Sequence, residues 1–121
     1  MTLYAGFREE DHTCLAEELT TLAQIHPNFA WHFTLTRPSA AWTGLRGRVT
    51  DCVPEKLDHR VLATAHFHLV GNGEMVHLVE SSLHRAGVSP ARVTIETYFN
   101  HYAHPSADEI DRLARRFLQL S

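Results

Sequence analysis

A glycine-rich turn stands where a strand pattern gives way to a helix pattern. Residues 65–70 form a short apolar run typical of a strand, and a helical spacing of apolar residues follows directly after the turn. At such a junction the first backbone N–H groups of the helix have no partner inside the helix, and the helix dipole is positive there. Phosphate groups are common ligands at this position. The candidate binding residues of the turn are Gly71, Asn72, Gly73, Glu74 and Met75.

Two arginines come shortly after apolar segments in the first third of the chain. Arg8 follows the run that ends at Gly6, and Arg37 follows Thr36 after a second apolar run. A guanidinium group fits a phosphate well because its planar fork donates two hydrogen bonds at once. The alternative is that Arg37 is a solvated loop arginine before Pro38, since arginines are mostly exposed. Both interpretations stay open at this point.

The elements that must position these residues alternate between strand and helix patterns. In chain order we expect strands at about 2–6, 29–35, 65–70 and 93–99, and helices at about 11–25, 49–57 with a break at Pro54, 74–86 and 107–120. Gly87 suits a left-handed helix end, and Ser106 with Glu109 fits a capping box. This order predicts an α/β fold in three layers, with a parallel sheet covered by helices on both faces.

Composition limits the class of protein. The chain has 121 residues, 44% of them hydrophobic, a net charge of −3 and no basic block, which predicts one domain over 1–121 and no nucleic-acid partner. No apolar run approaches the roughly 18 to 20 residues that cross a bilayer, so we expect no membrane contact and a cytoplasmic protein. Cys14 and Cys52 have no metal or redox spacing and are expected to be free thiols.

Ten histidines raise the question of a metal site. His66 and His68 should lie on one face of a strand, and His101 and His104 are further candidates. Metal sites need about three or four protein ligands, and no motif fixes an acidic or thiol partner near them. We therefore expect no metal. The sequence also lacks a Gly-x-Ser-x-Gly elbow, a Walker lysine and an HExxH helix, so it indicates no hydrolase or phosphotransferase and no particular catalytic residue.

Together these features resemble the nucleotide-binding half of the ferredoxin-NADP reductase family, which has a Rossmann-like fold. The matching residues, in order, are Gly6 and Arg8, then Leu35-Thr36-Arg37, then Trp42-x-Gly44-x-x-Gly47-Arg48-Val49-Thr50-Asp51, then Val70 to Met75, and finally Glu96-Thr97-Tyr98-Phe99. Members of this family are flavin-dependent oxidoreductases that pass electrons between a nicotinamide and a one-electron carrier. The resemblance covers the chain as far as Phe99.

The resemblance implies a role for several residues. Thr36 and Arg37 would meet the adenosine ribose of NADH or NADPH, and Arg37 can pair with the 2′-phosphate of NADPH. The turn from Gly71 to Met75 would lie beside the nicotinamide and flavin rings, with Phe99 close by. Val70 stands where the family often has a cysteine. The alternatives are an ordinary strand-to-helix turn capped by Asn72 and ordinary core aromatic residues.

Two family features do not occur in this sequence: a flavin-binding barrel and a first strand with a glycine-rich pyrophosphate turn. By resemblance the missing strand is the central one, so 3–5 and 67–70 would each lack an inner neighbour. Either the two halves of the sheet close directly on each other, or a second chain supplies the missing pairing, or the sequence is a fragment of a longer reductase. We expect an N-terminally truncated domain that self-associates as a homodimer. FAD or FMN would be held by a missing or partner domain, or by a redox partner protein, with little activity in the chain alone. The alternative is a non-catalytic remnant that serves as an interaction or assembly unit. The C-terminal helix, 106–120, is expected to pack on its own domain, or else to cover a sheet edge or dimer contact.

Overall fold

The computed structural model describes residues 1–98 and 104–120. The chain divides into two compact units, Met1–Val53 and Pro54–Ser121. The expected contacts of Phe99 and His101 lie outside the described residues. The expectation of a single domain stays a prediction.

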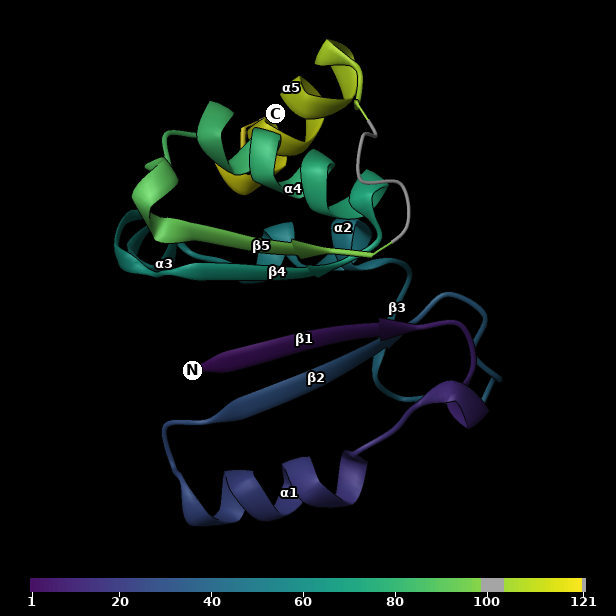
Figure 1. Ribbon diagram of the computed structural model, residues 1–121. Helices are drawn as coiled ribbons and strands as arrows, with labels where there is room; N and C mark the ends of the chain where they lie inside the picture. The colour runs from purple at the N-terminus through teal and green to yellow at the C-terminus, as the bar shows by residue number, and fades with distance from the viewer. Residues whose placement is uncertain (99–103, 121) are drawn as a thin grey trace. The chain divides into compact units, whose positions relative to one another are not determined.

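The first unit is built on a small parallel sheet with the strand order β1-β2-β3 (Figure 1). Its strands are β1 (Thr2–Phe7), β2 (Ala30–Leu35) and the two-residue β3 (Leu45–Arg46). Ala5 lies opposite Phe33 in the register, so apolar residues of β1 and β2 share one face of the sheet. Phe33 and Leu35 are the buried hydrophobic residues of this unit, and the Phe33 ring meets Phe7 and Trp31 edge-on at centroid distances of 5.0 and 4.8 Å.

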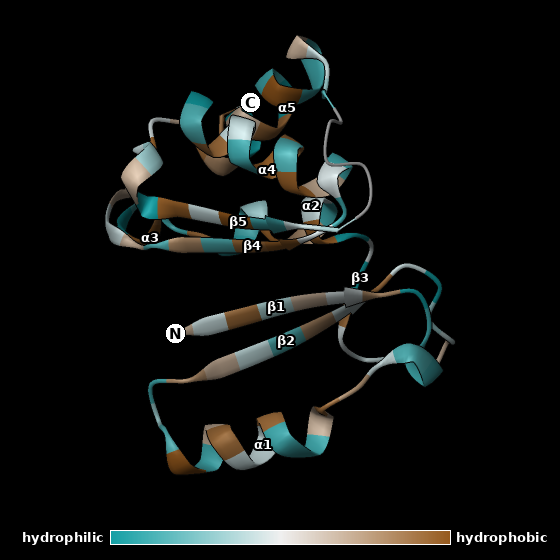
Figure 2. Ribbon diagram, viewed as in Figure 1, coloured by the Kyte–Doolittle hydropathy of each residue, from teal (hydrophilic) through white to brown (hydrophobic). Residues whose placement is uncertain are grey.

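Helix α1 (Ala16–Ile25) begins later than the sequence pattern indicates. Leu15 has a left-handed backbone with φ of 66°, and a separate 3-10 turn occupies Glu10–His12, so the predicted start near residue 11 is wrong. Hydrophobic and hydrophilic residues alternate along α1 (Figure 2), but none of its side chains is fully buried. The short helix α2 (Val49–Cys52) packs its Val49 methyl group against Gly6 of β1, where a Cβ atom would lie only 3.2 Å away.

The second unit pairs β4 (Phe67–Gly71) with β5 (Val93–Thr97) in parallel. Helix α4 (Gly73–Arg85) lies between this sheet and α5 (Ala107–Phe117), as Figure 1 shows. The hydrophobic core of the unit is formed by Leu62, Val79, Leu83, Val88, Leu113 and Phe117. The C-terminal helix therefore packs on its own unit, which was the simpler of the two expectations.

Local capping signals in the second unit are confirmed. Asn72 caps α4, Ser106 and Glu109 form a capping box at the start of α5, and Gly87 has φ of +102° after α4. The sequence pattern missed α3 (His59–Thr64), whose first turn is capped by Asp58. It also missed β3, which is too short to carry a strand pattern.

The parallel α/β class is confirmed, while a sheet interrupted at its centre stays a prediction. The described strands form one sheet of three and one of two, in which β1 pairs only with β2, and β4 pairs only with β5. Strands β1 and β4 therefore each have one edge whose backbone groups have no strand partner among the described residues. Among those residues, none of the helices has both the length and the apolar character that crossing a membrane requires.

Candidate functional site

The carboxyl ends of β1 and β2 bring Arg8, Thr36 and Arg37 together. The parallel hydrogen-bond pattern continues past the strands, because the Thr36 N–H donates to the Phe7 carbonyl at 3.0 Å and the Arg37 N–H to the Arg8 carbonyl at 2.7 Å. All three side chains are exposed. Within the described part of the chain, neither guanidinium group forms an ion pair or a side-chain hydrogen bond.

The neighbouring carboxylates do not neutralise this arginine pair through a salt bridge. The Glu10 carboxylate accepts a hydrogen bond at 2.7 Å from the Ser39 N–H, and so ties the loop after Arg37 to the segment after β1. The Arg46 guanidinium holds the same loop by donating to the carbonyls of Ser39 and Trp42, at 3.2 and 2.6 Å. The loop is thus fixed by contacts that leave Arg8 and Arg37 available to a ligand.

Two guanidinium groups on adjacent strand ends favour an anionic ligand. Adjacent strands lie about 4.8 Å apart, so Arg8 and Arg37 start from neighbouring backbone positions. A phosphate bound between them would attract both positive charges and accept several N–H groups. The Thr36 hydroxyl adds a donor and acceptor for a ribose or phosphate oxygen.

The glycine-rich turn joins β4 to α4 as the sequence predicts. The Asn72 side chain accepts a hydrogen bond from the Met75 N–H at 2.9 Å, while Gly73 is buried and Glu74 is exposed. The Gly73 and Glu74 N–H groups, at the first two helical positions, have no acceptor within the helix. The Glu74 carboxylate repels a phosphate at this place, so a neutral polar group suits the turn better.

The strand ends of the second unit also meet at this turn. The Tyr98 N–H donates to the Gly71 carbonyl at 2.8 Å, which places the end of β5 beside the turn. Val70, at the family's cysteine position, is 40% exposed and offers no thiol. Arg8, Thr36 and Arg37 belong to the first unit and Gly71 to Met75 to the second, so the candidate residues form two groups.

His66 and His68 lie on the same face of the second sheet, opposite the face covered by α4. Imidazole nitrogens of both hydrogen-bond to the Thr94 hydroxyl, at 3.1 and 2.7 Å, and His68 also lies 4.0 Å from the Glu96 carboxylate. Across residues 1–98 and 104–120, no group of three or more His, Cys, Asp or Glu side chains is placed to hold a metal ion. The histidine pair is thus part of an exposed hydrogen-bond network.

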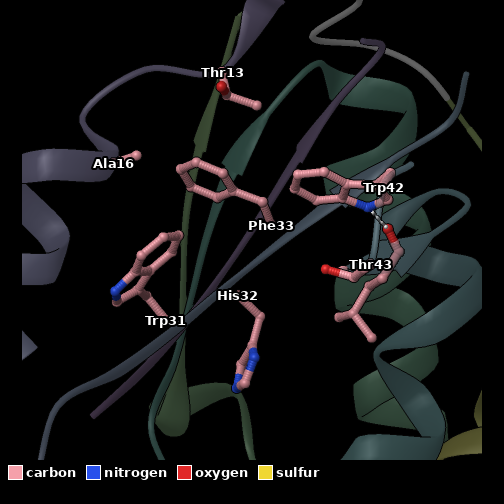
Figure 3. Close-up of a pocket in the computed structure, with 9 residues that line it drawn as sticks. Thr13, Ala16, Trp31, His32, Phe33, Trp42 and Thr43 are labelled. Carbon is pink, nitrogen blue, oxygen red and sulfur yellow. Dashed lines mark hydrogen bonds between the residues drawn. The ribbon is translucent and has the colours of Figure 1, made fainter. Parts of the chain in front are cut away.

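Sequence reasoning missed a hollow in the first unit. It has a volume of about 540 Å³ and is lined by aromatic residues of β2 and of the loop before β3 (Figure 3). The only signal for it in the sequence was that both tryptophans, Trp31 and Trp42, lie in this short region. His32, which also lines the hollow, stacks on Tyr4 with ring centroids 5.2 Å apart. Burial, with a further contribution from Cys52, raises the pKa of the Tyr4 phenol above 10.0.

Parallel strands whose ends carry free arginines, together with a glycine-rich strand-to-helix turn, define the class of nucleotide-binding α/β proteins. The chain belongs to the oxidoreductase NAD-binding domain family, whose model matches residues 1–81. The resemblance to the ferredoxin-NADP reductase family is thereby confirmed.

One similar protein, from Shewanella denitrificans, is a subunit of the Na(+)-translocating NADH-quinone reductase. It is 28% identical over an alignment of 102 residues, which covers 81% of this chain and 25% of the relative. The chain therefore spans about a quarter of the length of this curated relative. The individual site residues stay predictions.

Proposed function

We propose that this chain binds NADH or NADPH and presents it to a flavin held by another domain or protein. The observation that carries the proposal is the pair of guanidinium groups of Arg8 and Arg37 on adjacent strand ends, which have no partner among the described residues. When bound, the nicotinamide supplies a hydride and the flavin, FAD or FMN, accepts it. The residues of this chain would bind and orient the nucleotide.

The two groups of candidate residues suit different parts of the nucleotide. Arg8, Thr36 and Arg37 provide positive charge and a hydroxyl group, which fit the ribose and phosphate of the adenosine half. The turn at Gly71 to Met75 combines N–H donors with the negative Glu74, which fits the amide of the nicotinamide better than a phosphate. The similar protein from Shewanella denitrificans is a subunit of an NADH-quinone reductase, which supports an electron-transfer role.

Calorimetric titration of the chain with NADH and NADPH tests this proposal. We expect Arg37→Ala and Arg8→Ala each to weaken nucleotide binding roughly tenfold or more, because each removes charge-assisted hydrogen bonds. Arg60→Ala is the matched control, since Arg60 is an exposed arginine of the other unit. If neither nucleotide binds at millimolar concentration, or if all three variants bind equally, the proposed site is wrong.

The same titration also tests whether the chain prefers NADPH or NADH. If Arg37 holds a 2′-phosphate, Arg37→Ala should weaken NADPH binding more than NADH binding, because only NADPH carries that group. An equal effect on the two nucleotides would place Arg37 at a phosphate that they share.

A second candidate function, assembly of copies of this chain, is favoured by the open sheet edges. Strand β1 runs from Thr2 to Phe7 without a charged residue or proline, and β4 contains only one titratable side chain, His68. Natural edge strands usually carry such protective features, so an unprotected edge favours pairing with another strand. We therefore propose that the chain forms a homodimer or larger homo-oligomer through these edges.

Sedimentation at several concentrations tests the assembly. Leu3→Lys places a charge on the edge strand β1 and should shift the chain toward monomer. Leu22→Lys on α1 is the matched control, because Leu3 and Leu22 are 37% and 43% exposed. A wild-type chain that is monomeric at all concentrations would contradict the proposal.

The cytoplasmic location stays a prediction, and fluorescence microscopy of a tagged chain would test it.

A further inference from the structure

The hollow in the first unit lies beside β2, at the part of the strand that β3 does not reach. Strand β3 pairs only with Thr34 and Leu35, so the edge of β2 from Ala30 to Phe33 has no partner on that side among the described residues. The hollow is lined by Thr13, Ala16, Trp31, His32, Phe33, Trp42, Thr43, Gly44 and Leu45. Its volume of about 540 Å³ is within the range of small-molecule sites.

Three aromatic side chains form one wall of the hollow. The Trp42 indole N–H donates to the Leu45 carbonyl at 2.8 Å, and the indole lies against Gly44, where a Cβ atom would be only 2.5 Å from its ring. Phe33 is held by its edge-on contact with Trp31. Figure 3 shows Trp31 and Trp42 on the two sides of Phe33. A fixed aromatic surface binds a flat ring at a low entropy cost.

The polar groups of the lining limit the kind of ligand. None of the nine residues is Asp, Glu, Lys or Arg, so the lining carries no permanent charge, and its one imidazole is that of His32, which stacks on Tyr4. The Thr13 hydroxyl already donates to the Glu10 carbonyl at 2.7 Å. The Thr43 hydroxyl points toward the hollow in Figure 3 and has no hydrogen bond to another described residue. The lining therefore offers the Thr43 hydroxyl and the His32 imidazole to the polar edge of a ring.

We infer that this hollow binds a neutral planar aromatic ring with a hydrogen-bonding edge, stacked on Trp31, Phe33 and Trp42. Such a ring has two sources: the adenine base of a nucleotide or a free ring compound such as a flavin without phosphate. The adenine source rests on the proposed function. The free-ring source is independent of it.

Both tryptophans of the chain line the hollow, so tryptophan resonances report ligand binding there directly. The full chain is labelled with 5-fluorotryptophan, and the two ¹⁹F resonances are assigned with Trp31→Phe and Trp42→Phe. Adenosine and lumiflavin, neither of which has a phosphate, are then titrated separately. We expect saturable shifts of both resonances with at least one of the two rings, and the responsive ring identifies the source. No saturable shift with either would overturn the inference.

Two substitutions locate the binding. Ala16→Leu fills the hollow while keeping a good helix former in α1, and should weaken ring binding roughly tenfold, as expected for the loss of one stacking contact. Thr43→Val keeps the shape and removes the hydroxyl, and should weaken binding about fivefold. Ala63→Leu, at an exposed alanine of α3, is the matched control. If the first two variants bind the ring as tightly as the control does, the inference is wrong.

Failure of this inference is distinguishable from failure of the proposed function. Arg37→Ala should leave adenosine and lumiflavin binding unchanged, because neither carries a phosphate. If the chain binds NADPH but neither ring shifts the ¹⁹F resonances, the hollow is not a binding site and the arginine site stands. If a ring binds and no dinucleotide does, the proposed function fails and the hollow stands.

Discussion

Arg92 joins the start of β5 to the end of α3, and replacing it should destabilise the second unit. Its guanidinium donates to the Ala65 carbonyl at 2.9 Å and to the Leu62 carbonyl at 3.0 Å. Both carbonyls lie at the C-terminal end of α3, where the helix dipole also favours a positive charge. The contact spans 27 and 30 residues in sequence, so it fixes tertiary structure.

The magnitude follows from these two hydrogen bonds. A bond to a charged group contributes about 1.5 to 3 kcal/mol, and the lower end applies because Arg92 is half-buried. Water can reach the released carbonyls in part, so Arg92→Met should lower the free energy of unfolding by about 2 kcal/mol. Arg92→Lys keeps the charge but reaches one carbonyl at a time, and should cost about 1 kcal/mol.

Urea denaturation followed by circular dichroism measures this effect. A loss of about 2 kcal/mol corresponds to a decrease in Tm of about 10 °C for a unit of this size. Arg85→Met is the matched control, because Arg85 is 67% exposed and lies 3.6 Å from Asp111, in a contact worth under about 1 kcal/mol. If Arg92→Met is no more destabilising than Arg85→Met, the bridge to α3 does not stabilise the unit and the reasoning is refuted.

Three further predictions concern stability. The Ser82 hydroxyl is fully buried without a hydrogen-bond partner in the described part of the chain, so Ser82→Ala should raise the free energy of unfolding by about 1 kcal/mol, and a lower Tm would contradict this. Glu55→Gln removes the carboxylate that lies 2.8 Å from Arg116, and in urea titrations this partly exposed pair should contribute under about 1 kcal/mol, decreasing in high salt. Burial, and then Cys52, raises the pKa of Tyr4 above 10.0, so the folded state favours the neutral phenol. The neutral phenol therefore stabilises the folded state fully below pH 10.0, and this contribution is lost as pH rises through the raised pKa. The free energy of unfolding, measured across alkaline pH, should fall less steeply for Tyr4→Phe than for the wild type.

The elements that the sequence predicts well have strong local signals. Helix α4 begins at an Asn72 cap and ends before Gly87, and α5 begins at a Ser106 capping box, so both are found within a few residues of their expected bounds. Strand β2 is equally clear because its aromatic and β-branched residues favour strands. These signals are set by neighbouring residues and need no knowledge of the fold.

The missed elements depend on tertiary contacts. Strand β3 has two residues and exists because Leu45 and Arg46 pair with the end of β2. The true start of α1 depends on the left-handed backbone of Leu15, a conformation that a leucine seldom adopts and that no sequence pattern indicates.

One part of the candidate site could likewise be predicted from the sequence, and another part depends on tertiary contacts. The meeting of Arg8 with Thr36 and Arg37 follows from the parallel order of strands, which the sequence predicts. The hollow does not follow from any pattern, because it depends on the Trp42 indole lying against Gly44 and on β3 beginning only opposite Thr34 of β2. Its lining comes from three separate segments that only the fold brings together.

The absence of any fully buried side chain in α1 has a consequence for motion within the first unit. A helix that buries little apolar surface opens locally at a small free-energy cost, so the backbone amides of α1 should exchange with solvent deuterium much faster than those of α4, which contributes Val76, Val79 and Leu83 to a core. Ala16, in the first turn of α1, lines the aromatic hollow. The hollow is thus bounded on one side by a weakly protected segment, and any compound that occupies it should slow deuterium uptake there first.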